Sequence, residues 1–419
     1  MISSPPVEYL DRREPTRTWP PSLRLLLGDP ASEMWSAVLA PLGGRLRTLR
    51  ATNVHLQPDG AATVQYSAAV QWSDGRTGRE ALAATTGTRI PAGAAVLEGD
   101  AGGETVQVGL WRWPLDPALP ALARASSSER VGAWFEELGL ASGRPHLQLR
   151  SYRPGRRAVV EASTREGRFF LKVVRPSVVD GLVHRHAVLA GAVPVPPVLA
   201  SQPDGVIVLP GLSGTPMRSL LSGDGAGLPA AAELVRVLDA LPAGTAGLAA
   251  PGRHAPGDGL ARAAGHAAVL GAVAGHLRPR LSALIAALDC ADRGDHEYVP
   301  VHGDFYESQL LVDGGTVVGL LDVDTAGRGH RIDDWANLIA HLALLEQVLP
   351  TPSSVRRYRR EIEEAVGRRW PAAQLRPRVS AVLLGLATGP FRVQQANWPE
   401  LTEARVALAE AWGPDAPAA

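Results

Sequence analysis

The segment over residues 301–338 constrains the fold most strongly, because residues with carboxylate or amide side chains follow its apolar runs. It reads VHGDFYESQLLVDGGTVVGLLDVDTAGRGHRIDDWANL. Asp304 follows a His-Gly pair, Gln309 comes five residues later, and Asp322 ends an apolar strand eighteen residues after Asp304. Mg²⁺ prefers oxygen ligands of this kind, and a carboxylate can receive or orient an acceptor hydroxyl. This strand–loop–strand piece therefore suits phosphoryl transfer.

Around this segment the pattern predicts a strand-rich part followed by a helical part. Residues 147–153, 158–162 and 168–174 read as three consecutive strands, the first two joined by a Pro-Gly turn. A helix over residues 182–190 and a strand over 206–209 follow. Further helices are expected over residues 230–241, 259–288, 334–349, 355–368, 378–386 and 400–412. The expected fold class is α+β.

The chain begins with a different pattern. Val64, Tyr66, Ala68 and Val70 alternate with more polar residues, which indicates an antiparallel sheet, and a helix is expected over residues 31–39. Prolines then mark a linker before a helix around residues 129–138. We expect an α+β cap over residues 1–122, a strand-rich lobe with its linker helix over 123–210, and a helical lobe over 211–419.

Charge and composition narrow the partners. Lys plus Arg and Asp plus Glu number 42 each, so the formal net charge is zero and nothing favours nucleic acid or a charged membrane surface. No apolar run reaches the ~18 residues of a spanning helix, and the N-terminus lacks the apolar core of a secretory signal. Cys290 is the only cysteine, which fits a reducing compartment. We expect a cytoplasmic protein that binds small molecules.

These motifs together resemble a known family, the aminoglycoside phosphotransferase and choline kinase-like enzymes. The resemblance is carried by His302-Gly303-Asp304, Gln309, Leu320-Leu321-Asp322 and Asp334-Trp335-Ala336, and it covers roughly residues 147–412. It implies a protein-kinase-like bilobal fold, behind the cap, that uses ATP and Mg²⁺. The implied partners are ATP and a small hydroxyl-bearing acceptor such as a sugar, amino sugar or aminoglycoside.

The resemblance also implies roles for individual residues. Asp304 would orient and deprotonate the acceptor hydroxyl, and Gln309 and Asp322 would hold Mg²⁺. Lys172, near the end of the third strand, would bind the ATP phosphates. Leu209 would lie at the adenine-contacting hinge, and His302 and Asp334 would brace the loop. Arg156 is either a phosphate contact in the turn over the phosphates or part of a solvated hairpin tip. Asp324 is a second metal or acceptor contact or a structural turn carboxylate.

Two departures from the family pattern matter. Gln309 stands where the family usually has asparagine, which is similar to the maltokinase and glucosamine kinase branch; that branch also has an N-terminal cap. The helix after Lys172 reads His184-Arg185-His186-Ala187, with no glutamate to pair with the lysine. A nucleotide-binding pseudokinase, and a non-enzymatic interaction protein that uses the N-terminal sheet, therefore stay open as alternatives.

The acceptor site is the least constrained part. Arg392 and Gln395 are three residues apart, so one helical face could present both to sugar hydroxyls, with Trp398 available to stack on a ring. A helix end that packs on its neighbours is the competing interpretation. The sequence specifies neither the acceptor nor the oligomeric state.

Overall fold

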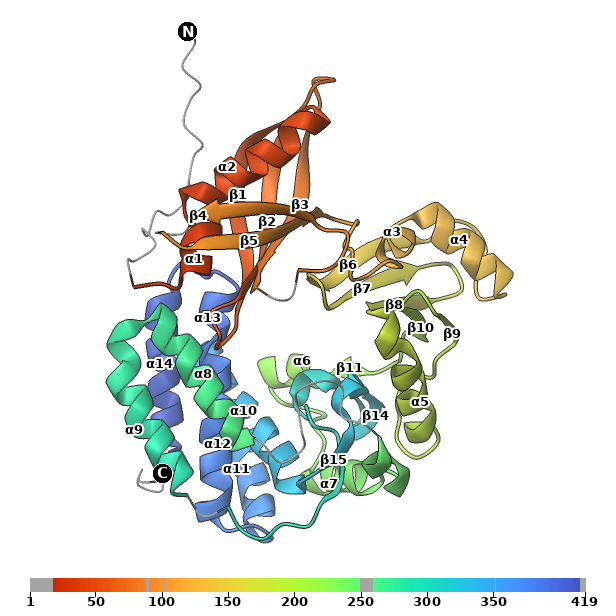
Figure 1. Ribbon diagram of the computed structural model, residues 1–419. Coiled ribbons are helices and arrows are strands. Elements are labelled where there is room, and N and C mark those ends of the chain that lie inside the picture. Colours follow the sequence, from red (N-terminus) through yellow and green to blue (C-terminus); the bar gives the residue numbers. More distant parts are fainter. Residues whose placement is uncertain are drawn as a thin grey trace.

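The structure is a computed structural model that describes residues 18–87, 90–100, 103–248, 259–291, 293–350 and 352–414. Figure 1 shows three bodies: a sheet with two helices (residues 18–112, the cap), a second sheet with its helices (122–210, the N-lobe) and a mainly helical body (211–414, the C-lobe). Residues 113–121 link the cap to the N-lobe. The fold is thus an α+β pair of lobes preceded by a cap.

The cap is built on a strand with regular alternation. β2 (Ala62–Trp72) buries every second residue, as the sequence predicts. Its Tyr66 donates a hydrogen bond to the carbonyl of Leu26 in α1 (Pro21–Leu27) and packs edge-on against Trp35 in α2 (Asp29–Leu39). The antiparallel order is β1-β2-β3-β5-β4, with β1 Gly44–Leu56, β3 Thr77–Thr86, β4 Ala95–Asp100 and β5 Thr105–Arg112.

The N-lobe sheet has helices on both faces. Its antiparallel order is β6-β7-β8-β10-β9, with β6 His146–Arg153, β7 Arg157–Ser163, β8 Arg168–Val174, β9 Ala200–Gln202 and β10 Val206–Pro210. α3 (Leu122–Ala125) and α4 (Ser128–Glu137) cover one face, where Phe135 meets Phe169 of β8 at 5.0 Å between rings. α5 (Val179–Leu189) covers the other face. Because strand side chains alternate, Lys172 lies on the α5 face.

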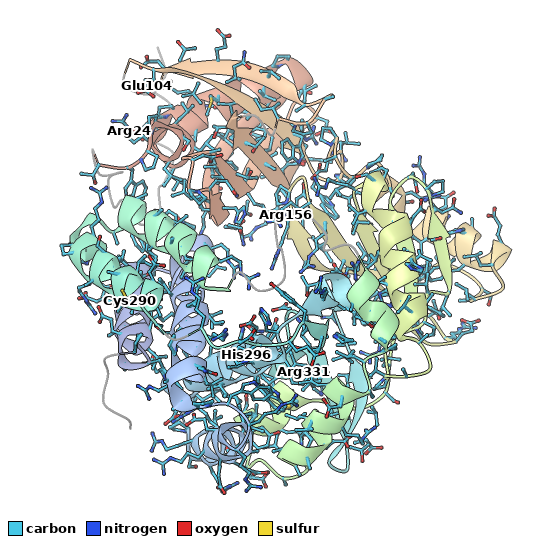
Figure 2. The ribbon with its side chains drawn as sticks, turned by 60° about the horizontal axis from the view of Figure 1, so that its bottom comes forward. Arg24, Glu104, Arg156, Cys290, His296 and Arg331 are labelled. Carbon is cyan, nitrogen blue, oxygen red and sulfur yellow. The ribbon has the colours of Figure 1, made fainter. Side chains whose placement is uncertain are left out.

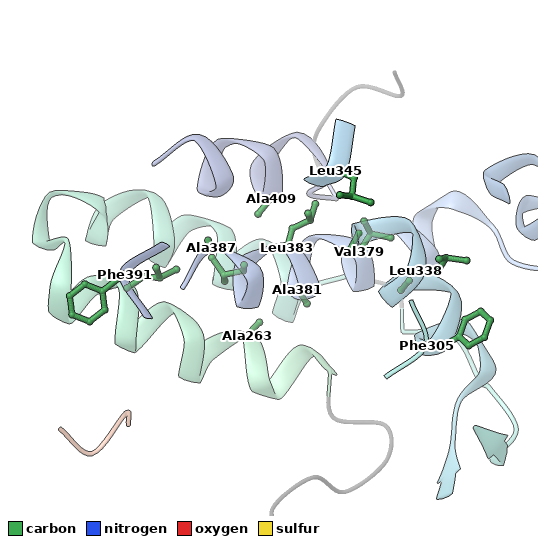
Figure 3. Close-up of a cluster of buried hydrophobic side chains, with 14 of the residues drawn as sticks. Ala263, Phe305, Leu338, Leu345, Val379, Ala381, Leu383, Ala387, Phe391 and Ala409 are labelled. Atoms are coloured by element: carbon green, nitrogen blue, oxygen red, sulfur yellow. The ribbon is translucent and has the colours of Figure 1, made fainter. Parts of the chain in front are cut away.

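The C-lobe is organised around two long buried helices, α10 (Arg331–Val348) and α12 (Ala372–Ala387). Figure 3 shows their apolar side chains in a cluster that runs from Phe305, in the loop after β12, to Phe391 in α13. The other helices are α6 Met217–Ser222, α7 Ala231–Asp239, α8 Gly259–Val273, α9 Arg278–Asp289, α11 Ser353–Gly367, α13 Gly389–Arg392 and α14 Trp398–Ala411.

Two small sheets carry the segment that the sequence singles out. One has the order β11-β13-β14, with β11 Thr215–Pro216, β13 Leu310–Asp313 and β14 Thr316–Leu320. The other pairs β12 (Val299–Val301) with β15 (Gly327–Gly329). The loops that leave these short strands therefore meet at one place in the C-lobe.

Two predicted helices differ from those observed. The single helix expected over residues 259–288 is two, α8 and α9, separated at Ala274 by a short 3₁₀ turn. Pro279 explains the break, because proline fits the first turn of a helix and not its interior. α12 instead begins before Pro377 and runs through it, since buried Leu375 and Val379 hold both sides of the proline in the core.

The cap rests on the C-lobe as well as on the N-lobe. The Trp19 indole N–H donates to the carbonyl of Val273 at the end of α8, at 3.1 Å, and the ring packs edge-on against Phe391 at 5.8 Å. β1 also runs beside α13. Within the described residues, no helix combines the length and apolar character that crossing a membrane requires.

Candidate active site

The loop after β12 is held by a buried carboxylate at the start of α10. The backbone N–H groups of His302 and Gly303 donate to the two carboxylate oxygens of Asp334 at 3.0 and 2.8 Å. Gly303 has φ +78°, and a side chain there would come within 2.7 Å of the Thr325 carbonyl oxygen. Only glycine fits this position. The His302 ring contacts the Leu321 carbonyl at 3.0 Å, which joins the loop to the strand that leads to Asp322.

Asp304 lies in this loop within reach of an amide. Asn337, one turn after Asp334 on α10, donates to the Asp304 carboxylate at 3.4 Å and to the Phe305 carbonyl at 3.2 Å. Burial, helped by the nearby Asp322 carboxylate, raises the pKa of Asp304. Asn337 is not among the predicted site residues; its spacing of three from Asp334, which places both on one helical face, is the signal that indicates it.

Asp322 and Asp324 form the centre of a charge cluster between the lobes. Lys172 of β8 donates to Asp322 at 2.9 Å and also to Asp324. Arg157, at the start of β7, reaches both carboxylates at 3.2 to 3.3 Å. Asp322, two residues after β14 ends, adopts a left-handed backbone with φ 51° and ψ 51°, which is uncommon outside glycine.

The charge cluster lowers the pKa of Asp322 and raises the pKa of Lys172. Burial alone would raise the pKa of Asp322, but the charges of Lys172 and Arg157 hold it well below its usual range. Burial alone would lower the pKa of Lys172, but the two carboxylates raise it. Both groups therefore stay charged near neutral pH, and the cluster is a strongly polar site between the lobes.

Gln309 is buried beside these groups. Its backbone carbonyl accepts a hydrogen bond from the Leu321 N–H at 2.8 Å, so Gln309 lies next to the residue that precedes Asp322. Gln309, Asp322 and Asp324 provide two carboxylates and an amide, all hard oxygen donors. Mg²⁺ is usually held by one or two carboxylates together with substrate phosphates, so this donor set fits it.

The helix expected to supply a partner for Lys172 carries an arginine instead. Arg185 of α5 is buried, and its Nε donates to the carbonyl of Ala326 at 2.8 Å, just beyond Asp324. His186 is also buried and contacts the Pro196 carbonyl at 2.8 Å, whereas His184 is exposed. α5 thus supports the loop after Asp324 from behind, and Lys172 has Asp322 and Asp324 as its partners.

The turn between β6 and β7 presents a group of arginines. Arg157 enters the charge cluster, while the sequence-predicted Arg156 lies between the cap and the N-lobe, 3.2 Å from His55 of β1 (Figure 2). Partial burial and the charges of Arg157, Arg392 and Arg156 lower the pKa of Arg153 to about 10. These arginines are therefore near one another. Leu209 lies apart from them, on β10 opposite Phe170.

A second buried carboxylate lies in the loop between Asp304 and Gln309. Glu307 is fully buried and pairs with Arg218 of α6 at 2.9 Å. The neighbouring Tyr306 stacks on His341 of α10, with ring centroids 4.0 Å apart. Burial, with the carboxylates of Asp304 and Glu307, raises the pKa of Tyr306 to about 12, so its hydroxyl stays a donor. The sequence analysis did not single out these residues.

The segment that the sequence proposes for the acceptor differs from its expected helical form. α13 ends at Arg392, and Gln395 lies in the following turn, so the two do not share a helical face. Both are exposed. Trp398 packs edge-on against Phe391 at 5.0 Å, which commits one part of its ring to the core.

Taken together, the two lobes and the charged groups between them define a kinase-like phosphotransferase. Residues 148–374 match the phosphotransferase enzyme family, over more than half of the chain. The chain belongs to this family and is a small-molecule phosphotransferase. No match was found among curated proteins.

Matches were also found among solved structures. One is a thermostable mutant of aminoglycoside phosphotransferase APH(4)-Ia in a ternary complex with ADP and hygromycin B, at 15% identity and a TM-score of 0.49, covering 67% of this chain and 97% of that one. Another is macrolide 2′-phosphotransferase MphH from Brachybacterium faecium, at 20% identity and a TM-score of 0.40, covering 70% and 99%.

Proposed function

We propose that the chain transfers the γ-phosphoryl group of ATP to a hydroxyl of a small molecule and requires Mg²⁺. The observation that carries this proposal is the cluster in which Lys172 of the N-lobe meets Asp322 and Asp324 of the C-lobe, beside Asp304. Phosphoryl transfer depends mainly on positioning and charge neutralisation, and this cluster supplies groups for both.

Asp304 is the proposed catalytic residue. It would accept the hydrogen bond of the acceptor hydroxyl and receive its proton as the oxygen attacks phosphorus. Asn337, which donates to the carboxylate, fixes its orientation. His302 and Asp334 would hold the loop in place through the bonds described above.

Gln309 and Asp322 are the proposed magnesium ligands, with Asp324 either at a second metal or at the acceptor. When bound, Mg²⁺ would neutralise charge that develops on the β- and γ-phosphates. Asp322 and Asp324 must release Arg157 for this, and Lys172 and Arg157 would then turn to the phosphate oxygens. Arg156 is a further proposed phosphate contact, and the backbone around Leu209 would contact the adenine.

For the acceptor we propose a sugar, an amino sugar or an aminoglycoside. Around Asp304 the side chains of Asn337 and Tyr306 offer hydrogen-bonding groups suited to hydroxyls. The charge of Arg392 contributes to the lowered pKa of Arg153 in the β6–β7 turn, which supports an acceptor site that extends to α13. Gln395 and the exposed part of Trp398 are the other proposed acceptor contacts.

The first test compares three carboxylates of the same segment. Asp304→Asn should lower the transfer rate by ~10²-fold or more while ATP binding persists, because the lost carboxylate acts on the acceptor. Asp322→Ala should lose both turnover and Mg²⁺-dependent ATP binding. Asp313→Asn, on the exposed end of β13, is the matched control. Turnover would be measured against a panel of sugars, amino sugars and aminoglycosides; an Asp304→Asn rate above about a tenth of wild type contradicts the assignment.

The second test concerns acceptor binding. Arg392→Ala and Gln395→Ala should each reduce kcat/KM for the acceptor by the ~1–3 kcal/mol expected when a hydrogen-bonding site loses a partner, with ATP affinity unchanged. The measurement is steady-state kinetics with the best acceptor from the panel. Wild-type efficiency in both variants would move the acceptor site away from α13.

A further inference from the structure

A buried carboxylate in the linker contacts the turn beside the charge cluster. Asp116 is only 2% exposed, although it lies outside every helix and strand. Its carboxylate accepts hydrogen bonds from the Gly155 N–H at 2.7 Å, the Tyr152 hydroxyl at 2.9 Å and the Ala118 N–H at 3.0 Å. Two of these three donors belong to the end of β6 and the β6–β7 turn.

The same contacts continue into the cap. The Tyr152 hydroxyl, which donates to Asp116, accepts from the indole N–H of Trp111 in β5 at 2.9 Å. The Tyr152 ring also packs edge-on against Trp113, with centroids 4.9 Å apart. One chain of hydrogen bonds therefore runs from the cap sheet through Tyr152 and Asp116 to the backbone of Gly155.

This chain ends where the turn passes into the charge cluster. Gly155 has φ +69°, a conformation that glycine adopts without strain, and its N–H is fixed by Asp116. Two residues later, Arg157 donates to Asp322 and Asp324. Arg156, between them, contacts His55 of the cap at 3.2 Å. The cap thus contacts this turn at two places, through Tyr152 and through Arg156, while Arg157 of the same turn reaches the charge cluster.

We propose that Asp116 is a positioning residue for nucleotide phosphates, and that the cap, through Trp111 and Tyr152, takes part in ATP binding by holding the β6–β7 turn. This inference rests on the proposed function, since it requires the phosphates to lie beside Lys172 and Arg157. Asparagine cannot fully replace Asp116. The Gly155 N–H and the Tyr152 hydroxyl share one carboxylate oxygen and the Ala118 N–H uses the other, so the amide NH₂ group must face one of these donors, and the remaining oxygen is neutral and a weaker acceptor.

The test separates phosphate binding from adenine binding. Asp116→Asn should raise the Kd for Mg-ADP roughly tenfold or more, as expected when a hydrogen bond to a charged group is lost, and leave the Kd for adenosine unchanged. Tyr152→Phe keeps the ring and removes the hydroxyl, so it should show the same selectivity with a smaller effect. Asp204→Asn is the matched control, because it breaks the Arg124–Asp204 ion pair in the same lobe, away from the turn.

The measurement is isothermal calorimetry on the full chain, with melting curves to verify folding. Unchanged Mg-ADP affinity in a folded Asp116→Asn variant overturns the inference, and so does an equal weakening of ADP and adenosine, which marks a purely structural role. If Asp116→Asn does not fold, Tyr152→Phe decides by the same criteria. A wild-type chain that binds no nucleotide overturns the proposed function, and this inference with it.

Discussion

At the scale of single residues, two adjacent aspartates at the start of α10 have separate tasks. Asp334 is buried and places one carboxylate oxygen on each of two backbone N–H groups, those of His302 and Gly303. Asp333 faces the other way and pairs with Arg378 of α12 at 3.0 Å. Asp334 thus supports the loop that carries Asp304, and Asp333 joins α10 to α12.

Asp334→Asn should therefore affect both stability and turnover. An amide has one oxygen, so one of the two N–H groups loses its acceptor, at about 1–3 kcal/mol of unfolding free energy. The displaced loop should lower kcat for every acceptor, because Asp304 follows Gly303 directly. Denaturant unfolding and steady-state kinetics would measure the two effects.

Asp333→Asn is the comparison that separates the two effects. It should lower stability through the lost pair with Arg378 and leave kcat close to that of wild type. If both variants lower kcat in proportion to their stability, Asp334 has no specific role in holding the loop.

At the scale of elements, strand register decides which arginine of the β6–β7 turn reaches the site. Lys172 pairs with Val159 on β7, and paired residues share a face of the sheet. Arg157 precedes Val159 by two residues and so lies on the same face as Lys172. The sequence singles out Arg156, because the strands could be predicted to within a residue or two but their pairing could not.

The charged partner of Lys172 could not be predicted from local pattern either. The residues of α5 contain no glutamate at the expected place, which left Lys172 without a partner in the sequence analysis. Asp322 and Asp324, about 150 residues later, take that position, and Arg185 supports their loop. Motifs within one loop, such as His302-Gly303-Asp304, are visible in sequence because spacing alone fixes them. Contacts between lobes depend on how the elements pack.

The helices show the same contrast between what local pattern predicts and what it does not. The apolar periodicity predicted α10, α11 and α14 to within three residues of their bounds. It missed the break between α8 and α9, because both halves of residues 259–288 are apolar enough to read as one helix. It also allowed Arg392 and Gln395 to share one helical face, whereas α13 ends at Arg392.

At the scale of the whole molecule, the cap joins the two lobes. It contacts the N-lobe through Trp111 and Tyr152 and the C-lobe through Trp19, whose ring lies against Phe391. Figure 1 shows the cap above α13 on one side and next to the N-lobe strand β6 on the other. The cap and the C-lobe helices share one hydrophobic cluster, which also contains Phe305 beside Asp304. A change at the cap can therefore reach α13, where we propose the acceptor contacts.

Trp19→Ala should show this coupling. The truncation removes an aromatic contact and the hydrogen bond to Val273, and should lower the unfolding free energy by up to about 3 kcal/mol, because large-to-small changes in a packed site cost this much. Since Phe391 adjoins Arg392, the same variant should raise the KM for the acceptor several-fold, while the Kd for Mg-ADP stays near that of wild type.

Trp412→Ala is the matched control: this half-buried tryptophan packs with Arg359 and Arg376, away from the cap. Melting curves, acceptor kinetics and ADP calorimetry would be measured on both variants. We expect both variants to lose stability and only Trp19→Ala to change the KM for the acceptor. An equal change of KM in both, or none in either, means that the cap does not influence the acceptor side.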